Sequence, residues 1–216
     1  MRDRNAPLTL DEIDRLDWAK MDGLVPAAVQ DQRSGQLLML GYMTREALAA
    51  TLTTNRVTFW SRSRQCLWTK GETSGHFLSL AAIHVDCDDD SLLLLAEPEG
   101  PICHLGSTSC FGEALPDGAA WLGQLSRIVA DRASNGDAES YTRRLLAEGP
   151  ARIAQKIGEE GVEIALAAVG RSNQACAEEV ADLLYHLAVL MESRGFGWSD
   201  VTAILQARHR SAIAPG

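Results

Sequence analysis

The sequence predicts a two-domain protein, an α+β domain of short strands and few helices followed by an all-α helical bundle. Before Phe111 the apolar runs are short and are separated by glycine, serine and aspartate, which is typical of strands joined by turns. After Gly118 every segment has helical spacing. The stretch between them, Gly112–Gly118 (GEALPDG), has the composition of a linker. We therefore expect domains over residues 1–113 and 119–216, each with its own core.

Local signals predict the elements of the first domain. Thr9 can cap a short helix over Asp11–Trp18. Two apolar runs flank Asp31–Gly35, which predicts a β-hairpin with Ser34-Gly35 at its turn. Thr44 is the expected N-cap of a helix that runs to Thr53. The remaining apolar runs predict strands over Val57–Ser61, Phe77–Asp86 and Ser91–Ala96.

Five helices are predicted in the second domain, because its apolar residues recur at helical spacing and its breaks contain glycine. They cover about Ala119–Ala133, Ala138–Glu148, Ala151–Val169, Asn173–Ser193 and Asp200–His209. Helices joined by breaks this short are expected to pack against one another as a bundle.

The composition indicates an ordinary globular protein that stays in the cytoplasm. Of the 216 residues, 46% are hydrophobic and 23% are charged, and the N-terminus lacks the apolar run of a signal peptide. A net charge of −9 disfavours nucleic acid and anionic membranes as partners. The odd number of cysteines, five, fits reduced thiols and metal binding better than disulfides.

A short window at the end of one predicted strand is rich in metal ligands. It contains Asp86, Cys87, Asp88, Asp89 and Asp90, with His84, Cys103, His104 and Cys110 near it in the sequence. Thiolates suit Zn²⁺, whereas carboxylates suit Mg²⁺. If Ile83–Asp90 is extended, alternation puts the even-numbered aspartates on one face and Cys87 on the other, which predicts adjacent Mg²⁺ and Zn²⁺ sites. The alternative is a solvated turn beside ordinary buried thiols, but three thiols near two histidines favour zinc and leave one position for water.

The loop before this window, Trp60–His76, carries groups that can hold phosphate oxygens. They are Ser61, Arg62, Ser63, Arg64, Lys70, Thr73 and Ser74. Trp60 and Trp68 could cover a base. The alternative is a surface loop with two structural tryptophans, and the position beside the metal window favours the binding interpretation.

Two predicted helices of the second domain carry clustered carboxylates. Glu159, Glu160 and Glu163 are three or four residues apart on one helix, and Glu179 and Asp182 are three apart on the next. Like charges at these spacings repel by about a few tenths of a kcal/mol per pair, and a divalent cation reverses that sign. A solvated acidic face is the alternative, but the second cluster on the neighbouring helix favours metal binding.

Long motifs in both halves resemble known enzymes. The first half resembles phosphoribosyl-AMP cyclohydrolases over about Leu24–Phe111, through LMLGYM, WSRSR, LWTKGETSG, DCDDD and CHLGSTSCF. The second half resembles phosphoribosyl-ATP pyrophosphohydrolases over about Trp121–Glu192, through KIGEEGVEIALA and EEVADLLYHLAVLM. The chain is therefore similar to the bifunctional histidine-biosynthesis enzymes that join these two activities.

The resemblance implies a bifunctional hydrolase. Its C-terminal domain would convert phosphoribosyl-ATP to phosphoribosyl-AMP and pyrophosphate, with Mg²⁺ on the clustered carboxylates and with Lys156 or Arg152 on the triphosphate. Its N-terminal domain would then open the adenine ring by zinc-assisted hydrolysis of the N1–C6 bond. The implied zinc ligands are Cys87, Cys103 and Cys110, with Cys87 supplied across a homodimer interface, and the implied Mg²⁺ ligands are Asp86, Asp88 and Asp90. His104 and His84 are the candidate proton carriers.

Two other functions fit part of the pattern. A zinc nucleoside deaminase also uses thiolate-bound zinc, but that class needs an HxE motif and a PCxxC pair, and neither occurs. A zinc-stapled interaction module with a helical dimerisation domain would have four protein ligands and catalytically silent zinc.

Overall fold

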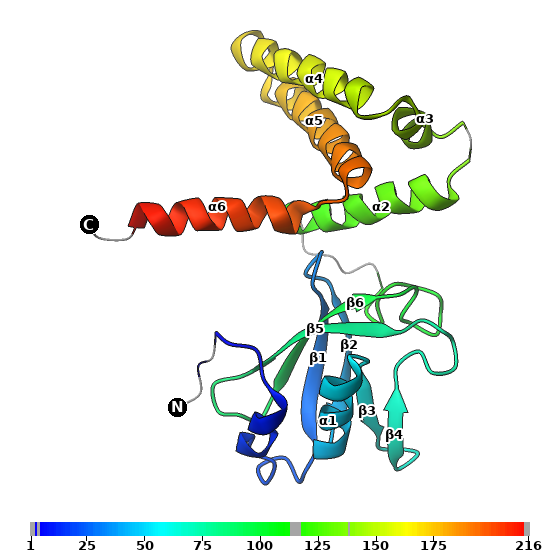
Figure 1. Cartoon of the computed structure of the whole chain (residues 1–216), viewed down its shortest axis with the longest axis vertical. Coiled ribbons are helices and arrows are strands. Elements are labelled where there is room, and N and C mark those ends of the chain that lie inside the picture. Colours follow the sequence, from blue (N-terminus) through cyan, green and yellow to red (C-terminus); the bar gives the residue numbers. More distant parts are fainter. Residues whose placement is uncertain (1–2, 4, 113–117, 138, 214–216) are drawn as a thin grey trace. The chain divides into compact units, whose positions relative to one another are not determined.

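The computed structural model describes residues 3, 5–112, 118–137 and 139–213, and it divides into two compact units (Figure 1). The first unit (Met1–Ala120) contains all the strands, and the second unit (Trp121–Gly216) is helical. The predicted fold class, α+β followed by all-α, is confirmed. The centre of the predicted linker, residues 113–117, lies outside the described residues, and the predicted boundaries 1–113 and 119–216 stay a prediction.

A four-stranded sheet forms the centre of the first unit. Its strands are β1 (Val25–Asp31), β2 (Leu37–Met43), β5 (Leu78–Val85) and β6 (Leu92–Pro98), in the order β2-β1-β6-β5. β1 runs antiparallel to β2 and parallel to β6, and β5 runs antiparallel to β6. The predicted hairpin around Asp31–Gly35 is confirmed. Its turn is closed by the buried Asp31 carboxylate, which accepts hydrogen bonds from the backbone N–H groups of Arg33 (3.1 Å) and Ser34 (3.3 Å).

A second hairpin corrects the expectation that Trp60–His76 is a single loop. β3 (Thr58–Ser61) pairs with β4 (Cys66–Thr69) as a separate two-stranded sheet. β4 has four residues and buries none of them fully, so it carries no alternating pattern from which it could have been predicted. The hairpin reaches β2 at Gly41, where a Cβ atom would lie 2.3 Å from the Phe59 ring. Glycine at that position therefore permits the close approach of the two sheets.

Two helical elements cover this unit. α1 (Arg45–Thr54) begins as predicted at Thr44, whose side chain accepts a hydrogen bond from the Ala47 N–H (3.3 Å). The N-terminal segment forms a 3-10 helix, η1 (Leu10–Arg15), with a capping box between Thr9 and Glu12. It is shorter than the expected helix to Trp18. The Trp18 side chain is buried and its indole N–H donates to the Ile13 carbonyl (2.9 Å), so the chain after η1 folds back on it.

The second unit contains five α-helices, each overlapping a predicted one. They are α2 (Trp121–Asn135), α3 (Tyr141–Glu148), α4 (Pro150–Gly170), α5 (Asn173–Arg194) and α6 (Trp198–Ile213), after a short 3-10 helix η2 (Gly118–Ala120). Pro150 occupies the first turn of α4, and Ser172 caps α5 by accepting from the Ala175 N–H (3.2 Å). The core between α2, α3, α4 and α5 is formed by Leu125, Val129, Leu145, Ile153, Ala188 and Val189.

α6 joins the other four helices through its first residue, because Trp198 packs against their core. It extends away from α4 and α5 (Figure 1), and nearly all its side chains up to Arg210 are exposed, including Ile204 (54%) and Leu205 (55%). Helical periodicity predicted the helix but not what it packs against. Over the described residues, no helix is both long and apolar enough to span a membrane.

We predict that the two units fold independently when residues 1–113 and 114–216 are expressed separately, because each has its own buried core. Circular dichroism should show mixed secondary structure for the first piece and helix for the second. Each piece should unfold cooperatively at a temperature close to the matching transition of the whole chain. If neither piece folds while the whole chain does, the boundaries are wrong.

Candidate active sites

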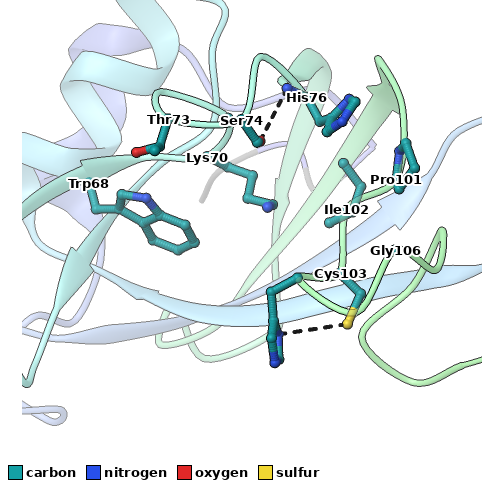
Figure 2. Close-up of a pocket in the computed structure, with 11 residues that line it drawn as sticks. Trp68, Lys70, Thr73, Ser74, His76, Pro101, Ile102, Cys103 and Gly106 are labelled. Carbon is teal, nitrogen blue, oxygen red and sulfur yellow. Dashed lines mark hydrogen bonds between the residues drawn. The ribbon is translucent and has the colours of Figure 1, made fainter.

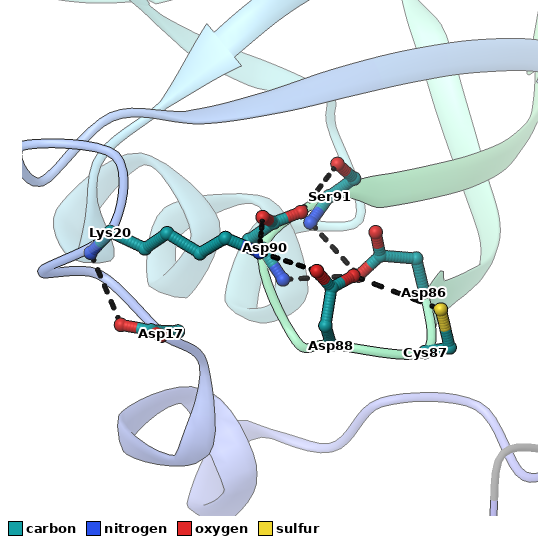
Figure 3. Close-up of polar contacts among 7 residues, drawn as sticks. All are labelled: Asp17, Lys20, Asp86, Cys87, Asp88, Asp90 and Ser91. Carbon is teal, nitrogen blue, oxygen red and sulfur yellow. Dashed lines mark hydrogen bonds and ion pairs between the residues drawn. The ribbon is translucent and has the colours of Figure 1, made fainter.

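The first candidate site is an acidic turn, Asp86–Asp90, after β5 (Figure 3). The extended conformation assumed for Ile83–Asp90 is wrong, because β5 ends at Val85 and Asp89 has a φ of 59°. The Asp86 carboxylate accepts hydrogen bonds from the N–H groups of Asp90 (3.0 Å) and Ser91 (3.1 Å), and this local bonding replaces strand pairing. The turn still brings Asp86, Asp88 and Asp90 together, with one oxygen of each within 4.8 Å of the others.

Lys20 supplies a cation to the acidic turn. Its ammonium group pairs with Asp88 and Asp90, which lowers the pKa of both carboxyls and raises the pKa of Lys20. Two bonds position this lysine: its backbone N–H donates to the Asp17 carboxylate (3.1 Å), and the Asp17 N–H donates to the Asp89 carbonyl (2.8 Å). No local pattern could predict this partner, because Lys20 is 68 residues from Asp88.

The three predicted zinc thiols do not meet within one chain. In the described part of the chain, no group of three metal-binding side chains within 4.8 Å includes a cysteine. Cys103 and Cys110 are neighbours: burial and the Cys103 sulfur raise the pKa of the Cys110 thiol, whereas a backbone hydrogen bond from Leu105 lowers the pKa of Cys103. Cys87 lies apart on the acidic turn, 3.8 Å from Asp88 Oδ1. A pair of thiols is therefore ready for a third ligand.

A cavity of about 420 Å³ opens beside this thiol pair (Figure 2). It is lined by Trp68, Lys70, Gly71, Thr73, Ser74, His76, Pro101, Ile102, Cys103, His104 and Gly106. A Cβ atom at Gly100 would lie 2.2 Å from His76 Nδ1, so glycine there lets the imidazole approach the chain. His104 Nδ1 lies 3.9 Å from the Cys103 sulfur. The cavity thus combines an aromatic wall, a lysine, two hydroxyls and two histidines.

The structure divides the predicted binding residues of the first unit. Lys70, Thr73, Ser74 and His104 line the cavity, whereas Trp60, Ser61, Arg62, Ser63, Arg64 and His84 are outside its described lining. Arg62 lies over the Tyr42 ring at 4.0 Å, and Arg64 lies 5.9 Å from the centre of Trp68. His76 was missed by the sequence analysis, although Gly71 and Gly75 near it mark a loop in unusual conformation.

The second candidate site is a helical acidic cluster, formed by Glu160 on α4 with Glu179 and Asp182 on α5. One oxygen of each lies within 4.8 Å of the others. Burial and then the neighbouring Glu163 raise the pKa of the Glu179 carboxyl. The Arg171 guanidinium donates to Glu179 (3.0 Å), a contact that the sequence analysis did not predict. Four of the five predicted carboxylates are thus associated with one place.

The fifth predicted carboxylate, Glu159, faces the cations of α4. It accepts hydrogen bonds from Lys156 (2.7 Å) and Gln155 (2.9 Å), and Arg152 lies 4.0 Å away. The pairing with Lys156 lowers the pKa of the Glu159 carboxyl. Lys156 also lies 3.4 Å from Glu160. Lys156 is therefore next to the helical acidic cluster, whereas Arg152 lies closer to Glu148 (3.4 Å). The role of Glu159 as a ligand stays a prediction.

Comparison with known proteins gives the same division of the chain. The family model for phosphoribosyl-AMP cyclohydrolase matches residues 39–112, and that for phosphoribosyl-ATP pyrophosphohydrolase matches residues 122–209. The histidine biosynthesis bifunctional protein HisIE of Yersinia pestis is 52% identical over 202 residues, which cover 94% of this chain and 98% of that protein. The HisIE protein of Xylella fastidiosa is 53% identical over 207 residues, which cover 95% and 99%. The resemblance inferred from the motifs is confirmed.

We predict that Lys20→Met lowers stability at neutral pH and lets the acidic turn bind Mg²⁺ several-fold more tightly, because a divalent cation no longer competes with the ammonium group. The depressed pKa values of Asp88 and Asp90 mean that their stabilising contribution is present at neutral pH and is lost as pH falls through those values. Melting temperatures of parent and variant in chelator should therefore converge below about pH 4. Lys20→Arg, which keeps the charge, should behave like the parent. If the melting temperatures of parent and variant differ by a constant amount down to pH 2, the ion pair is not the cause of the difference.

Proposed function

The chain belongs to the family of bifunctional histidine-biosynthesis hydrolases, and from this premise we propose which residues carry each of its two reactions. It is a phosphoribosyl-ATP pyrophosphohydrolase, which releases pyrophosphate and leaves phosphoribosyl-AMP, and a phosphoribosyl-AMP cyclohydrolase, which opens the adenine ring. Family membership also sets aside the deaminase and the zinc-stapled interaction module. The observation that carries the residue assignment is the convergence of Glu160, Glu179 and Asp182 from two helices.

The helical acidic cluster fits Mg²⁺ by its donor set. Carboxylate oxygens are the ligands that this ion takes in proteins, together with water and substrate phosphates. The raised pKa of Glu179 reflects burial and the nearby Glu163, both of which favour a bound cation over an empty acidic pocket. Mg²⁺ supplies charge neutralisation for the leaving pyrophosphate. We assign Glu163 to this set because it faces Glu179, and Glu159 as a further candidate.

The chain's own cations bind the triphosphate in this proposal. Lys156 and Arg152 lie along α4: Glu159 pairs with Lys156 (2.7 Å) and lies 4.0 Å from Arg152, which is also 3.4 Å from Glu148. A triphosphate tail that enters can replace Glu159 as their partner. The carboxylates not engaged by metal then accept a proton from the attacking water, as a general base does.

In the first unit, the cavity residues fit a purine ribonucleotide. Trp68 offers a flat surface for the base, and Lys70, Thr73 and Ser74 offer a cation and hydroxyls for phosphate. His104 lies beside Cys103 and is the better placed of the two predicted histidines to move a proton, since His84 is on β5 outside the described lining. His76 is a further candidate in the same cavity.

The metals of the first unit are assigned by ligand type. The acidic turn fits Mg²⁺ through Asp86, Asp88 and Asp90. Cys103 and Cys110 fit Zn²⁺ as neighbouring thiols, and a backbone hydrogen bond already favours the thiolate of Cys103. Zn²⁺ there would activate water for hydrolysis of the N1–C6 bond.

We propose a homodimer in which Cys87 of one chain completes the zinc site of the other. The separation of Cys87 from the thiol pair within one chain supports this arrangement. The second unit also leaves apolar side chains on α4 exposed, Val162 (60%), Leu166 (61%) and Val169 (92%), as expected of a surface that a second copy covers. Five free cysteines fit the reducing cytoplasm as the compartment.

We predict that Cys103→Ser and Cys110→Ser each lose zinc and cyclohydrolase activity, because a hydroxyl replaces a thiolate poorly, while pyrophosphate release persists. Elemental analysis and separate assays of the two steps measure this. Full zinc content in both variants would contradict the assignment.

Mixing inactive chains tests the shared site. A refolded mixture of Cys87→Ser and Cys103→Ser chains should recover about a quarter of parental cyclohydrolase activity, since half of randomly paired dimers hold one intact site of two. A mixture of Cys103→Ser and Cys110→Ser chains is the control and should recover none. No recovery in the first mixture would mean that Cys87 serves its own chain or none.

We predict that Glu163→Gln and Asp182→Asn fold at least as well as the parent in chelator, because each removes a like-charge repulsion of tenths of a kcal/mol. Both should lose most of the Mg²⁺-induced rise in melting temperature and most of the pyrophosphate release, while ring opening continues. The double variant should be little worse than either single one. If both single variants release pyrophosphate at parental rates, the assignment of Mg²⁺ binding to these helices is wrong.

A further inference from the structure

One buried histidine beside the helical acidic cluster has no role in the function proposed above. His186 on α5 is 4% exposed, and its Nε2 lies 3.1 Å from the hydroxyl oxygen of Tyr141, which begins α3. Its other ring nitrogen, Nδ1, is buried without a hydrogen-bond partner in the described part of the chain. Buried polar atoms rarely lack a hydrogen-bond partner, so we asked which neighbouring group Nδ1 could bond to.

Nδ1 of His186 faces hydrogen-bond acceptors. Oε1 of Glu160 lies 3.4 Å away, and the backbone carbonyl of Asp182, one turn earlier on α5, also acts on the ring. The two ring nitrogens face different groups: Nδ1 faces a carboxylate, which can only accept a hydrogen bond, and Nε2 faces a tyrosine hydroxyl, which can donate one. A lone pair on Nδ1 would face the Glu160 carboxylate and be repelled by it. The proton therefore belongs on Nδ1, and Nε2 accepts a hydrogen bond from Tyr141.

The neighbouring rings hold the imidazole in this orientation. His186 meets Tyr141 and Tyr185 edge-on, with ring centres 6.1 and 5.4 Å apart. The Tyr185 hydroxyl is itself paired with Thr142 (2.8 Å), so it does not compete for either nitrogen of the histidine. Turning the ring over would exchange the two nitrogens and give up the Tyr141 contact.

We propose that Tyr141 and His186 form a positioning relay for Glu160, in which the tyrosine hydroxyl fixes the histidine tautomer and Nδ1–H orients the carboxylate toward Glu179 and Asp182. This inference rests on the proposed Mg²⁺ site. The 3.4 Å separation is longer than the roughly 3.2 Å limit of an ordinary N–H···O bond, so the relay requires the carboxylate to move closer to the ring. Oε1 is also 3.4 Å from Lys156, so the same oxygen faces both the ring nitrogen and an ammonium group. Such outer partners set the orientation of metal ligands without touching substrate.

The tautomer can be read without metal. Long-range proton–nitrogen NMR spectra of the full chain with ¹⁵N-labelled histidine, recorded in chelator, should show His186 protonated on Nδ1; the His186→Gln spectrum assigns its signals. Tyr141→Phe should shift the population toward the Nε2 tautomer. The isosteric control Tyr185→Phe, which removes only the bond to Thr142, should leave it unchanged. An Nε2 tautomer in the parent would overturn the relay.

Position-specific replacements test what Nδ1 does. Asparagine places its amide nitrogen near Nδ1 and glutamine places it near Nε2, so His186→Asn should keep Mg²⁺ affinity while His186→Gln should weaken it by about 10-fold or more. Calorimetric titration with Mg²⁺ measures this in a chain that carries Asp88→Asn and Asp90→Asn to silence the acidic turn. Equal losses of Mg²⁺ affinity in the two variants would mean that His186 contributes only packing, and would overturn the relay. If the chain with His186 intact does not bind Mg²⁺, the proposed metal site is wrong. The tautomer spectra, which need no metal, show separately whether the relay is wrong.

Discussion

The need to hold carboxylates close together against their mutual repulsion governs both candidate sites. Each site gathers three acidic oxygens within 4.8 Å, and neither leaves them without a counter-charge. Lys20 pairs with the acidic turn, while Lys156 and Arg171 pair with Glu160 and Glu179 of the helical acidic cluster. Partial neutralisation of this kind reduces the repulsion among the carboxylates and still leaves each cluster with excess negative charge, as the proposed Mg²⁺ sites require. The backbone must then be rigid, and it is: a hydrogen-bonded turn in one site and two packed helices in the other.

Rigidity explains which parts of the sites were predictable from the sequence. The carboxylates themselves were, because their spacing is local: three residues apart on a helix, or alternate residues in a short window. The geometry of the acidic turn was not, since Asp86 bonds to the backbone of Asp90 and Ser91 and so ends the strand that alternation assumed. The predicted group of three carboxylates was correct although the predicted conformation was wrong, because this tight turn also brings residues i, i+2 and i+4 together.

Partners that come from distant parts of the chain could not be predicted in the same way. Lys20, Arg171 and the Tyr141–His186 pair have no local pattern that distinguishes them from surface charges or core aromatics. The elements of the fold also divide into those that local sequence predicts and those that depend on distant partners. Hairpins and capped helices follow from residues next to one another. In contrast, β4 pairs with β3, and α6 has a clear helical sequence but packs on the bundle core only through Trp198 in the described residues. Periodicity reports what a segment does alone, and packing decides the rest.

The position of Cys87 connects the two metals proposed for the first unit. It lies inside the acidic turn, between Asp86 and Asp88, so the backbone that orients two hard ligands also presents one soft ligand. The thiol lies beside these carboxylates, with its sulfur 3.8 Å from Asp88 Oδ1. In the described residues Cys87 belongs to no group of three metal-binding side chains, which is why we proposed that it serves a partner chain. In the proposed dimer, the Mg²⁺ ligands and the third zinc ligand would therefore come from a single segment of five residues, so a change in this turn should affect both metals.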